Sequence, residues 1–221
     1  MRYEEWEPYY LAILEDFGYS MEADVAAAKM LAQLMFRSIP CNDDCLNGMI
    51  KGEVTVCGDA PSLIKDLREV GTVGTVMAAD GATTRLMEAG IVPDIIMTDL
   101  DGEAAPQISA NAQGAIIVAH AHGDNVPALR SCIPLFTGRL VASTQAPPFG
   151  NVRNYGGFTD GDRAVMVARH FGAKRILLLG FDFLEPREKS GRDRAIKVRK
   201  LEWARHLIFD LNPPGTCLSI P

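Results

Sequence analysis

The 221-residue sequence predicts an α/β fold with an open, mostly parallel sheet that carries helices on both faces. From Glu53 onwards, short apolar runs alternate with segments in which apolar residues recur at helical spacing. The apolar runs do not alternate with polar residues, as in ILLLG at 176–180, which is typical of strands buried on both faces. Regular alternation of strand and helix favours parallel strands joined by right-handed crossovers.

The first fifty residues follow a different pattern. Apolar residues recur three and four apart in residues 6–17 and 21–36, and Ser20 is a suitable N-cap for the second segment. The stretch SIPCNDDCLNG then interrupts the helical spacing. We therefore expect an N-terminal helical appendage over residues 1–50 and an α/β catalytic domain over residues 51–221.

Six strands and five helices are expected in the α/β domain. The strands are residues 54–57, 75–79, 94–98, 115–119, 140–142 and 175–179, and the helices are residues 61–69, 83–89, 105–112, 126–132 and 161–171. The segment from Glu185 to His206 contains eight Lys or Arg residues and keeps helical spacing at Val198, Leu201 and Ala204. Its charges either face solvent on an amphipathic helix or reach the phosphates of a ligand.

Composition sets the class of the protein. Apolar residues make up 48% and charged residues 23%, as in folded globular proteins. No apolar run approaches the roughly 20 residues that span a bilayer, and the start MRYEEWEPYY lacks the features of a signal peptide. Five cysteines without a C-x-x-C pair argue against a disulfide framework, so we expect a cytoplasmic protein. The net charge of −6 argues against nucleic-acid or membrane partners.

An aspartate follows each of five predicted strands. These residues are Asp59, Asp80 (with Gly81), Asp99 with Asp101, Asp124 and Asp182. A single Asp-Gly pair is an ordinary turn or cap. Open parallel sheets, however, bind ligands at the carboxyl ends of their strands, where these five junctions would meet. We therefore expect a ligand site at this edge of the sheet.

The pair Asp99-x-Asp101 predicts a magnesium site. Residues two apart in an extended chain point to the same side, so both carboxylates can face one ion. Mg²⁺ prefers one or two carboxylates together with water and substrate phosphates. D-x-D alone is common in surface turns, but here it follows an apolar strand, and Asp80 and Asp124 are expected at neighbouring strand ends.

The segment HAHGDN follows the fourth of these strands. H-x-H at a strand end also occurs in zinc hydrolases built on barrels, but such folds need about 250 residues and further ligands. We therefore expect His120, His122 and Asn125 to line the site or to form hydrogen bonds there.

The segment GGFTDGDRA opens a helix. Thr159 or Asp160 can cap this helix. Alternatively, its N-terminal N–H groups can bind phosphate, with Arg163 as an additional charged contact. An acidic helix start binds phosphate only when a metal ion lies between them. Alternatively, its aspartates can bind a nitrogen-rich heterocycle. Asp160 is left open between cap and site, while Asp162 is expected in the site. Neither a P-loop nor a G-x-G-x-x-G motif is present.

These motifs resemble those of a known enzyme family. HAHGDN, GGFTDGDRA, ILLLGFDF and KVRKLEWARHLI are similar to the archaeal-type 6-hydroxymethyl-7,8-dihydropterin pyrophosphokinases, and the likeness covers residues 54–208. ADGATTRLMEAGIVPDIIMTDLDG more distantly resembles the catalytic domain of thiamine pyrophosphokinases. Thr98 replaces a Gly and Gly102 a Ser of the thiamine enzymes, so the pattern departs from that branch.

The resemblance implies a thiamine-pyrophosphokinase-like sheet and an AMP-releasing transfer of pyrophosphate from ATP to a reduced pterin, in tetrahydromethanopterin or folate-type cofactor synthesis. It also implies that Asp80, Asp99, Asp101 and Asp124 surround Mg²⁺ and the ATP phosphates. The alternatives are a thiamine pyrophosphokinase-like enzyme, a metal-dependent D-x-D glycosyltransferase and a non-catalytic nucleotide-binding subunit. The expected ligands are ATP and a small heterocyclic alcohol, and a homodimer is left open.

Overall fold

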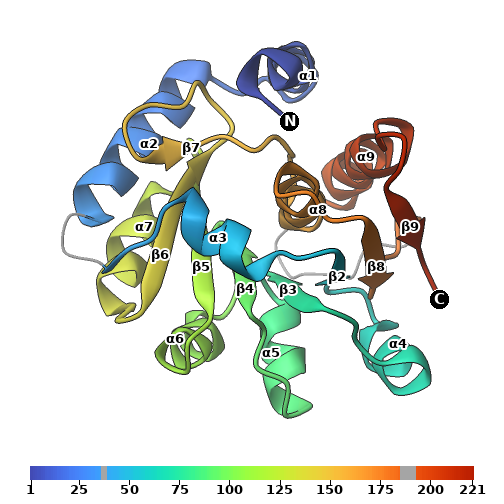
Figure 1. The fold of residues 1–221 in the computed structure, drawn as a ribbon. Helices are drawn as coiled ribbons and strands as arrows, with labels where there is room; N and C mark the ends of the chain where they lie inside the picture. The colour runs from blue at the N-terminus through green and yellow to red at the C-terminus, as the bar shows by residue number, and fades with distance from the viewer. Residues whose placement is uncertain (36–38, 185–192) are drawn as a thin grey trace.

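The structure, a computed structural model, describes residues 1–35, 39–184 and 193–221. Its centre is one sheet whose strands run in the order β1-β6-β5-β4-β3-β2-β8-β9, with β7 paired to β6, and every strand pair is parallel (Figure 1). The strands are β1 Ile39–Pro40, β2 Glu53–Cys57, β3 Thr75–Ala79, β4 Ile95–Thr98, β5 Ile116–Ala121, β6 Arg139–Thr144, β7 Val152–Arg153, β8 Arg175–Leu179 and β9 Cys217–Ser219. The α-helices are α1 Tyr3–Phe17, α2 Met21–Leu34, α3 Asp43–Met49, α4 Leu63–Val70, α5 Ala82–Glu88, α6 Ala104–Ala112, α7 Val126–Cys132, α8 Asp160–His170 and α9 Arg194–Arg205.

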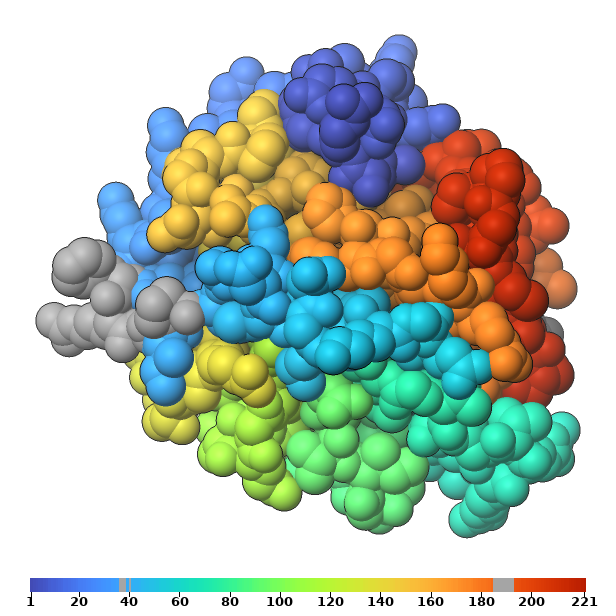
Figure 2. Space-filling view, viewed as in Figure 1, coloured from blue at the N-terminus to red at the C-terminus, as the bar shows by residue number. Residues whose placement is uncertain are grey.

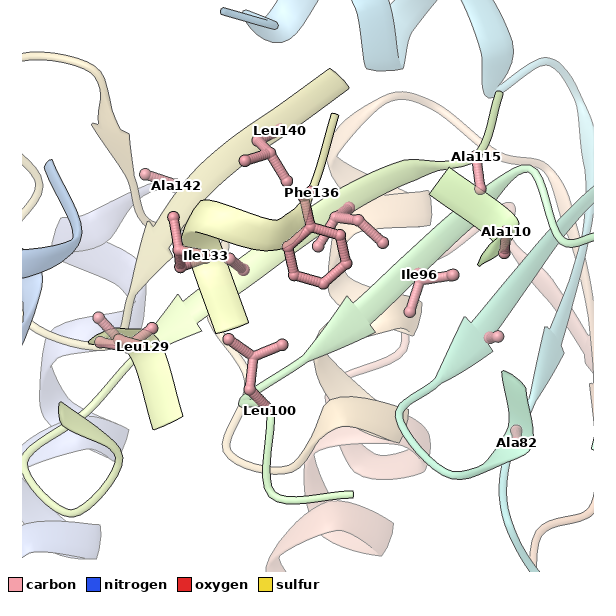
Figure 3. Packing of buried hydrophobic residues seen from close by; sticks show 14 of the residues in the cluster. Ala82, Ile96, Leu100, Ala110, Ala115, Leu129, Ile133, Phe136, Leu140 and Ala142 are labelled. Carbon is pink, nitrogen blue, oxygen red and sulfur yellow. The ribbon is translucent and has the colours of Figure 1, made fainter. Parts of the chain in front are cut away.

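Helices cover both faces of the sheet because successive strand residues point to opposite sides. In β4, Ile96 packs on one face in the cluster formed with α2, α4, α5, α6 and α7, part of which Figure 3 shows. Its neighbours Ile95 and Met97 pack on the other face, in a cluster with α3 and α8. The predicted fold class, an open parallel α/β sheet covered on both sides, is therefore confirmed.

All six predicted strands and all five predicted helices of residues 51–221 are present, with ends shifted by one or two residues. Strand β5 continues to Ala121, so His120 lies within the strand rather than in the following loop. The sequence pattern missed β1, β7, β9 and α3, which are short and depend on pairing or packing with distant segments. Position 36 of the predicted helix 21–36 lies outside the described residues, and α2 ends at Leu34.

The first fifty residues pack closely on the rest of the chain. Trp6, Tyr10 and Ile13 of α1 are fully buried in a cluster with Phe158 and Met166. Figure 2 shows α1 in dark blue against the gold segment near residue 145, where the Trp6 Nε1–H donates to the Gln145 carbonyl at 2.9 Å. Strand β1 also joins the main sheet. The division of the chain at residue 50 stays a prediction.

The basic C-terminal segment forms α9, which continues into a π-helix at His206–Asp210. Residues 185–192, which carry three of the eight basic side chains, lie outside the described residues. Within the described part of the chain, no helix has the length and apolar character needed to cross a bilayer.

Candidate active site

A cavity of about 620 Å³ lies at the carboxyl ends of five strands that are adjacent in the sheet: β5, β4, β3, β2 and β8. The loops after these strands contribute most of its lining because parallel strands end on the same edge. Sequence-predicted residues that line it are Asp59, Asp80, Gly81, Asp99, Asp101, His122, Asp124, Asn125, Asp160, Arg163 and Asp182. The structure therefore brings together eleven of the thirteen predicted site residues in one cavity. Asp162 and His120 are the exceptions, and His120 is buried within β5, where its Nδ1 lies 3.1 Å from the Ser143 hydroxyl.

Three of these aspartates form a compact cluster. Carboxylate oxygens of Asp80, Asp99 and Asp160 lie within 4.8 Å of one another. Asp101 and Asp124 line the same cavity, but they are more exposed and stand outside this cluster. The predicted metal set of Asp80, Asp99, Asp101 and Asp124 thus differs from the observed cluster, in which Asp160 from the start of α8 takes the third place.

Asp80 is fixed by its surroundings. Its Oδ1 accepts hydrogen bonds from the Thr98 hydroxyl and the Gln107 amide, both at 2.9 Å. Asp80 also has a φ of 39°, in the left-handed region that side-chain-bearing residues rarely adopt, and strain of this kind is commonly found at functional sites. The side chain is 6% exposed. Its position is therefore set by two side-chain donors and by the β3–α5 turn.

The closeness of Gly102 to Asp80 gives a first test. A Cβ atom on Gly102 would lie 2.4 Å from Asp80 Oδ2. Because Asp80 is held at Oδ1 and buried, Gly102→Ala should displace it, and we expect kcat to fall by about 10-fold or more. Gly48→Ala is the matched control, since a Cβ at Gly48 in α3 meets nothing within 4 Å. A Gly102→Ala protein with unchanged kcat would show that the position of Asp80 is unimportant.

Asp99 is bound to His122. His122 Nε2 lies 3.3 Å from Asp99 Oδ2, while His122 Nδ1 accepts the Asp124 N–H at 3.4 Å. The second contact places the imidazole proton on Nε2, so His122 donates to Asp99. Burial disfavours the charged form of Asp99, but the hydrogen bond from His122 and the charge of Arg163 outweigh it, and the pKa of Asp99 lies below its usual range. Asp99 is therefore ionised at neutral pH.

Asn125 holds the loop that presents His122. Its Oδ1 accepts the His122 N–H at 3.1 Å, and its Nδ2 donates to the carbonyls of Asp99 and His120, both at 2.7 Å. With its side chain bound to three backbone groups and only 5% of the residue exposed, Asn125 connects the ends of β4 and β5. It therefore acts in the cavity wall by positioning its neighbours.

Asp160 and Asp162 have different roles at the start of α8. Thr159 is the N-cap, and Asp162 forms the capping box with it, accepting from the Thr159 N–H at 2.9 Å and hydroxyl at 2.7 Å. Asp162 is fully buried and does not reach the cavity, so the structure gives it the capping role and not the ligand contact that we expected. Asp160, one residue after the cap, directs its carboxylate to the cluster and to Arg163 at 3.1 Å.

The cluster fits a hard divalent cation. Burial and the charge of Asp99 raise the pKa of Asp160 well above its usual range, although Arg163 opposes this shift. A cation between the two carboxylates would favour the ionised form of both. Oxygen ligands are those that Mg²⁺ prefers, at about 2.1 Å from the ion, and oxygens already within 4.8 Å of one another need small movements to reach this geometry.

Asp59 and Asp182 also line the cavity. Asp59 Oδ1 pairs with Arg85 Nε of α5 at 3.2 Å, which fixes the carboxylate beside Gly81. Asp182 is exposed, and its Oδ1 accepts the Leu184 N–H at 2.9 Å. These two residues follow β2 and β8, the strands at which the sheet order changes direction. Open α/β sheets bind ligands in the crevice at this kind of switch point.

Two further contributions could not be assigned to particular residues from the sequence. Lys197 and Lys200 of α9 line the cavity, and only the wider basic character of their segment hinted at this. The second is Asp24 of α2, which is 3% exposed and does not line the cavity. Its carboxylate accepts hydrogen bonds from the Gly123 N–H at 2.7 Å and from the Gln145 amide at 2.8 Å. A buried aspartate in an N-terminal helix cannot be matched to a partner about a hundred residues away without the fold.

Comparisons with known proteins identify the family of the chain. The family described as 6-hydroxymethylpterin diphosphokinase MptE-like matches residues 33–188. The chain is 41% identical to the 6-hydroxymethyl-7,8-dihydropterin pyrophosphokinase of Methanothermobacter thermautotrophicus, over 97% of each chain. It is 38% identical to the protein of that name from Methanocaldococcus jannaschii, over 94% of this chain and 95% of the relative.

A solved structure, the MAf glycosyltransferase from Magnetospirillum magneticum AMB-1, matches 88% of this chain with a TM-score of 0.47 and 16% identity, and this chain spans 37% of that one. This similarity is too low to support an argument about activity. The match to the pterin enzymes is different in kind, since it combines about 40% identity with nearly full coverage. The chain belongs to the 6-hydroxymethylpterin diphosphokinase MptE-like family.

Proposed function

We propose that this protein transfers the pyrophosphate group of ATP to the hydroxymethyl group of 6-hydroxymethyl-7,8-dihydropterin and releases AMP, as a step of tetrahydromethanopterin or folate-type cofactor synthesis. The observation that carries the proposal is the cluster of Asp80, Asp99 and Asp160 on a cavity of about 620 Å³. A cavity of this size accommodates small-molecule ligands. Relatives named for this activity match over almost the whole chain, which supports the same chemistry here.

In this reaction the hydroxymethyl oxygen attacks the β-phosphorus of ATP, and the bond from that phosphorus to the oxygen bridging the α- and β-phosphates breaks. AMP leaves with this oxygen. Transfers of this type depend mainly on positioning and on stabilisation of charge. Mg²⁺ bound to Asp80, Asp99 and Asp160 would neutralise charge on the phosphate oxygens.

The remaining site residues position these groups. Thr98 and Gln107 hold Asp80, and His122 holds Asp99, so the carboxylates face the cavity with little freedom. Arg163 pairs with Asp160 from a nearly buried position. The hydroxyl proton passes to Asp101 or Asp124, which line the cavity outside the cluster.

One assay tests the proposal. ATP, Mg²⁺ and the reduced pterin alcohol are incubated with the protein, and the nucleotide products are separated. We expect AMP in a one-to-one ratio with pterin pyrophosphate, and none without the pterin. ADP formation, or no turnover despite nucleotide binding, would contradict the proposed reaction. UDP or GDP release from a sugar donor would support the glycosyltransferase alternative.

We also propose that the protein works in the cytoplasm, with ATP and the reduced pterin as its ligands and without a nucleic-acid or membrane partner. The net charge of −6 supports the last point, since it opposes binding to other polyanions. A homodimer is proposed only as an assembly to be checked by sedimentation velocity.

A further inference from the structure

Helix α9 forms one wall of the cavity. Lys197, Lys200, Leu201 and Ala204 recur at helical spacing and all line it. This helix follows residue 188, where the match to the family model ends, so the model itself does not cover it. Its apolar members pack, and its two lysines bring positive charge to a cavity that is otherwise strongly acidic.

Lys200 is held by aromatic rings rather than by an acid. Its Nζ lies 5.3 Å from the ring centroid of Phe158 and 5.6 Å from that of Tyr19. In the described ranges 1–35, 39–184 and 193–221, no carboxylate oxygen lies within 4.0 Å of this ammonium group. Cation–π contacts stabilise the position of a lysine without neutralising its charge. Phe158 itself lines the cavity, so the ammonium group is seated at the cavity wall.

Acidic side chains outnumber basic ones in the cavity lining. Eight aspartates line the cavity, against Arg163, Lys197 and Lys200 as the Lys and Arg side chains among the described lining residues. Arg163 is 4% exposed and already paired with Asp160. A polyphosphate needs more positive charge than one metal ion and this buried arginine supply. Lys200 lines the cavity and forms no ion pair with an acid among the described residues, so it can provide this additional positive charge.

Carboxylates that line the same cavity interact electrostatically with Lys200. Burial and the charge of Arg163 lower the pKa of Lys200, and Asp99, Asp101 and Asp124 oppose this shift. These three residues thus attract the ammonium group from beyond contact distance. Because they and Lys200 line the same cavity, an anion bound there can contact Lys200 and reach the acidic cluster through a metal ion.

The N-terminal helices hold α9 in this place. Asp16, at the end of α1, pairs with Arg199 and accepts a hydrogen bond from Trp203 Nε1 at 2.9 Å. The Arg199 guanidinium also lies 4.8 Å from the centroid of the Phe17 ring. Asp16 and Phe17 therefore fix α9 on both sides of Lys200 in the sequence, at Arg199 and Trp203, and the ammonium group is positioned before a ligand binds.

We propose that Lys200 binds the polyphosphate chain of the nucleotide, opposite the Asp80, Asp99 and Asp160 cluster. This inference rests on the proposed function for the identity of the nucleotide, but the contact itself is to any polyphosphate. It makes α9, together with the residues of α1 that hold it, part of the substrate site.

Lys200→Met tests the contact because it keeps the apolar stem and removes the charge. Binding of ATP, of inorganic triphosphate and of adenosine is measured by calorimetry with Mg²⁺ and without the pterin. We expect Lys200→Met to weaken ATP and triphosphate at least about 10-fold, the effect of one charged hydrogen bond, and to leave adenosine within about two-fold. Lys200→Arg should recover most of the affinity, since it keeps the cation and its aromatic contacts.

Lys174→Met is the matched control, an exposed lysine at the amino end of β8 that does not line the cavity. Triphosphate binding by Lys200→Met at the wild-type level would overturn the inference. Equal losses for adenosine and ATP would also overturn it, because they would indicate a structural role. If wild-type protein binds triphosphate through Lys200 but makes no AMP from ATP and pterin, the proposed function fails and the inference stands.

Discussion

Asp99→Asn is expected to lower kcat by about 10³-fold while the protein stays folded. Asp99 belongs to the cluster with Asp80 and Asp160 and receives the hydrogen bond from His122. Its pKa lies below the usual range, so the substitution removes a full negative charge at neutral pH and changes the shape of the side chain very little. Both the affinity for the metal and the stabilisation of charge in transfer should fall.

The metal dependence separates this role from a general loss of structure. Mn²⁺ binding, measured by calorimetry without substrates, should weaken at least about 10-fold in Asp99→Asn, as expected for the loss of a charged ligand. Asp44→Asn makes the same chemical change at an exposed carboxylate in the first turn of α3 and should leave both quantities unchanged. Normal kcat and Mn²⁺ affinity in Asp99→Asn would remove Asp99 from the metal site.

Asp24→Ala is expected to destabilise the protein by roughly 3 kcal/mol or more, which lowers Tm by about 6 °C or more for a chain of this length. The Asp24 carboxylate accepts hydrogen bonds from the Tyr10 hydroxyl at 2.7 Å, the Gly123 N–H at 2.7 Å and the Gln145 amide at 2.8 Å. Alanine would leave these three donors without their acceptor in a site that is 3% exposed. Urea denaturation of the two proteins gives the difference in free energy.

The activity of the same variant should fall as well. Asp24 fixes the loop that carries His122, and through Gln145 it reaches Arg163, whose NH2 group lies 3.4 Å from the Gln145 side chain. Tyr10→Phe is the graded control, since it removes one of the three bonds and should cost only about 1 kcal/mol. If Asp24→Ala lowers the free energy of unfolding by less than about 1 kcal/mol, water replaces the carboxylate and the hydrogen-bond network has no structural importance.

The convergence of the strand-end aspartates could be predicted because it depends on local pattern. Apolar runs without alternation identify strands buried on both faces, and their regular alternation with helices makes them parallel. Once the strands are parallel, Asp59, Asp80, Asp99 and Asp182 must lie on one edge whatever the packing details. The family resemblance implied Asp80, Asp99, Asp101 and Asp124 as the metal site, and the family itself is confirmed by relatives about 40% identical over almost the whole chain.

The composition of the cluster could not be predicted in the same way. Asp160 enters it because α8 starts one residue after Thr159, which turns the Asp160 carboxylate outwards and that of Asp162 back to the helix end. A sequence pattern locates a helix end only to within one or two residues. That uncertainty is enough to exchange a capping carboxylate for a ligand, as at Asp160 and Asp162.

The sequence by itself determined the doubly covered parallel sheet, the edge on which ligands bind and the acidic character of that edge. These follow from periodicity and from the order of strands and helices, which are properties of neighbouring residues. Only the tertiary structure decided that Asp160 joins Asp80 and Asp99, that Asp24 supports the loop of His122, and that Lys200 faces the cavity. Apart from the nearby pair Asp80 and Asp99, these contacts join segments about 40 or more residues apart, and side-chain directions across such separations are fixed by packing and not by local pattern.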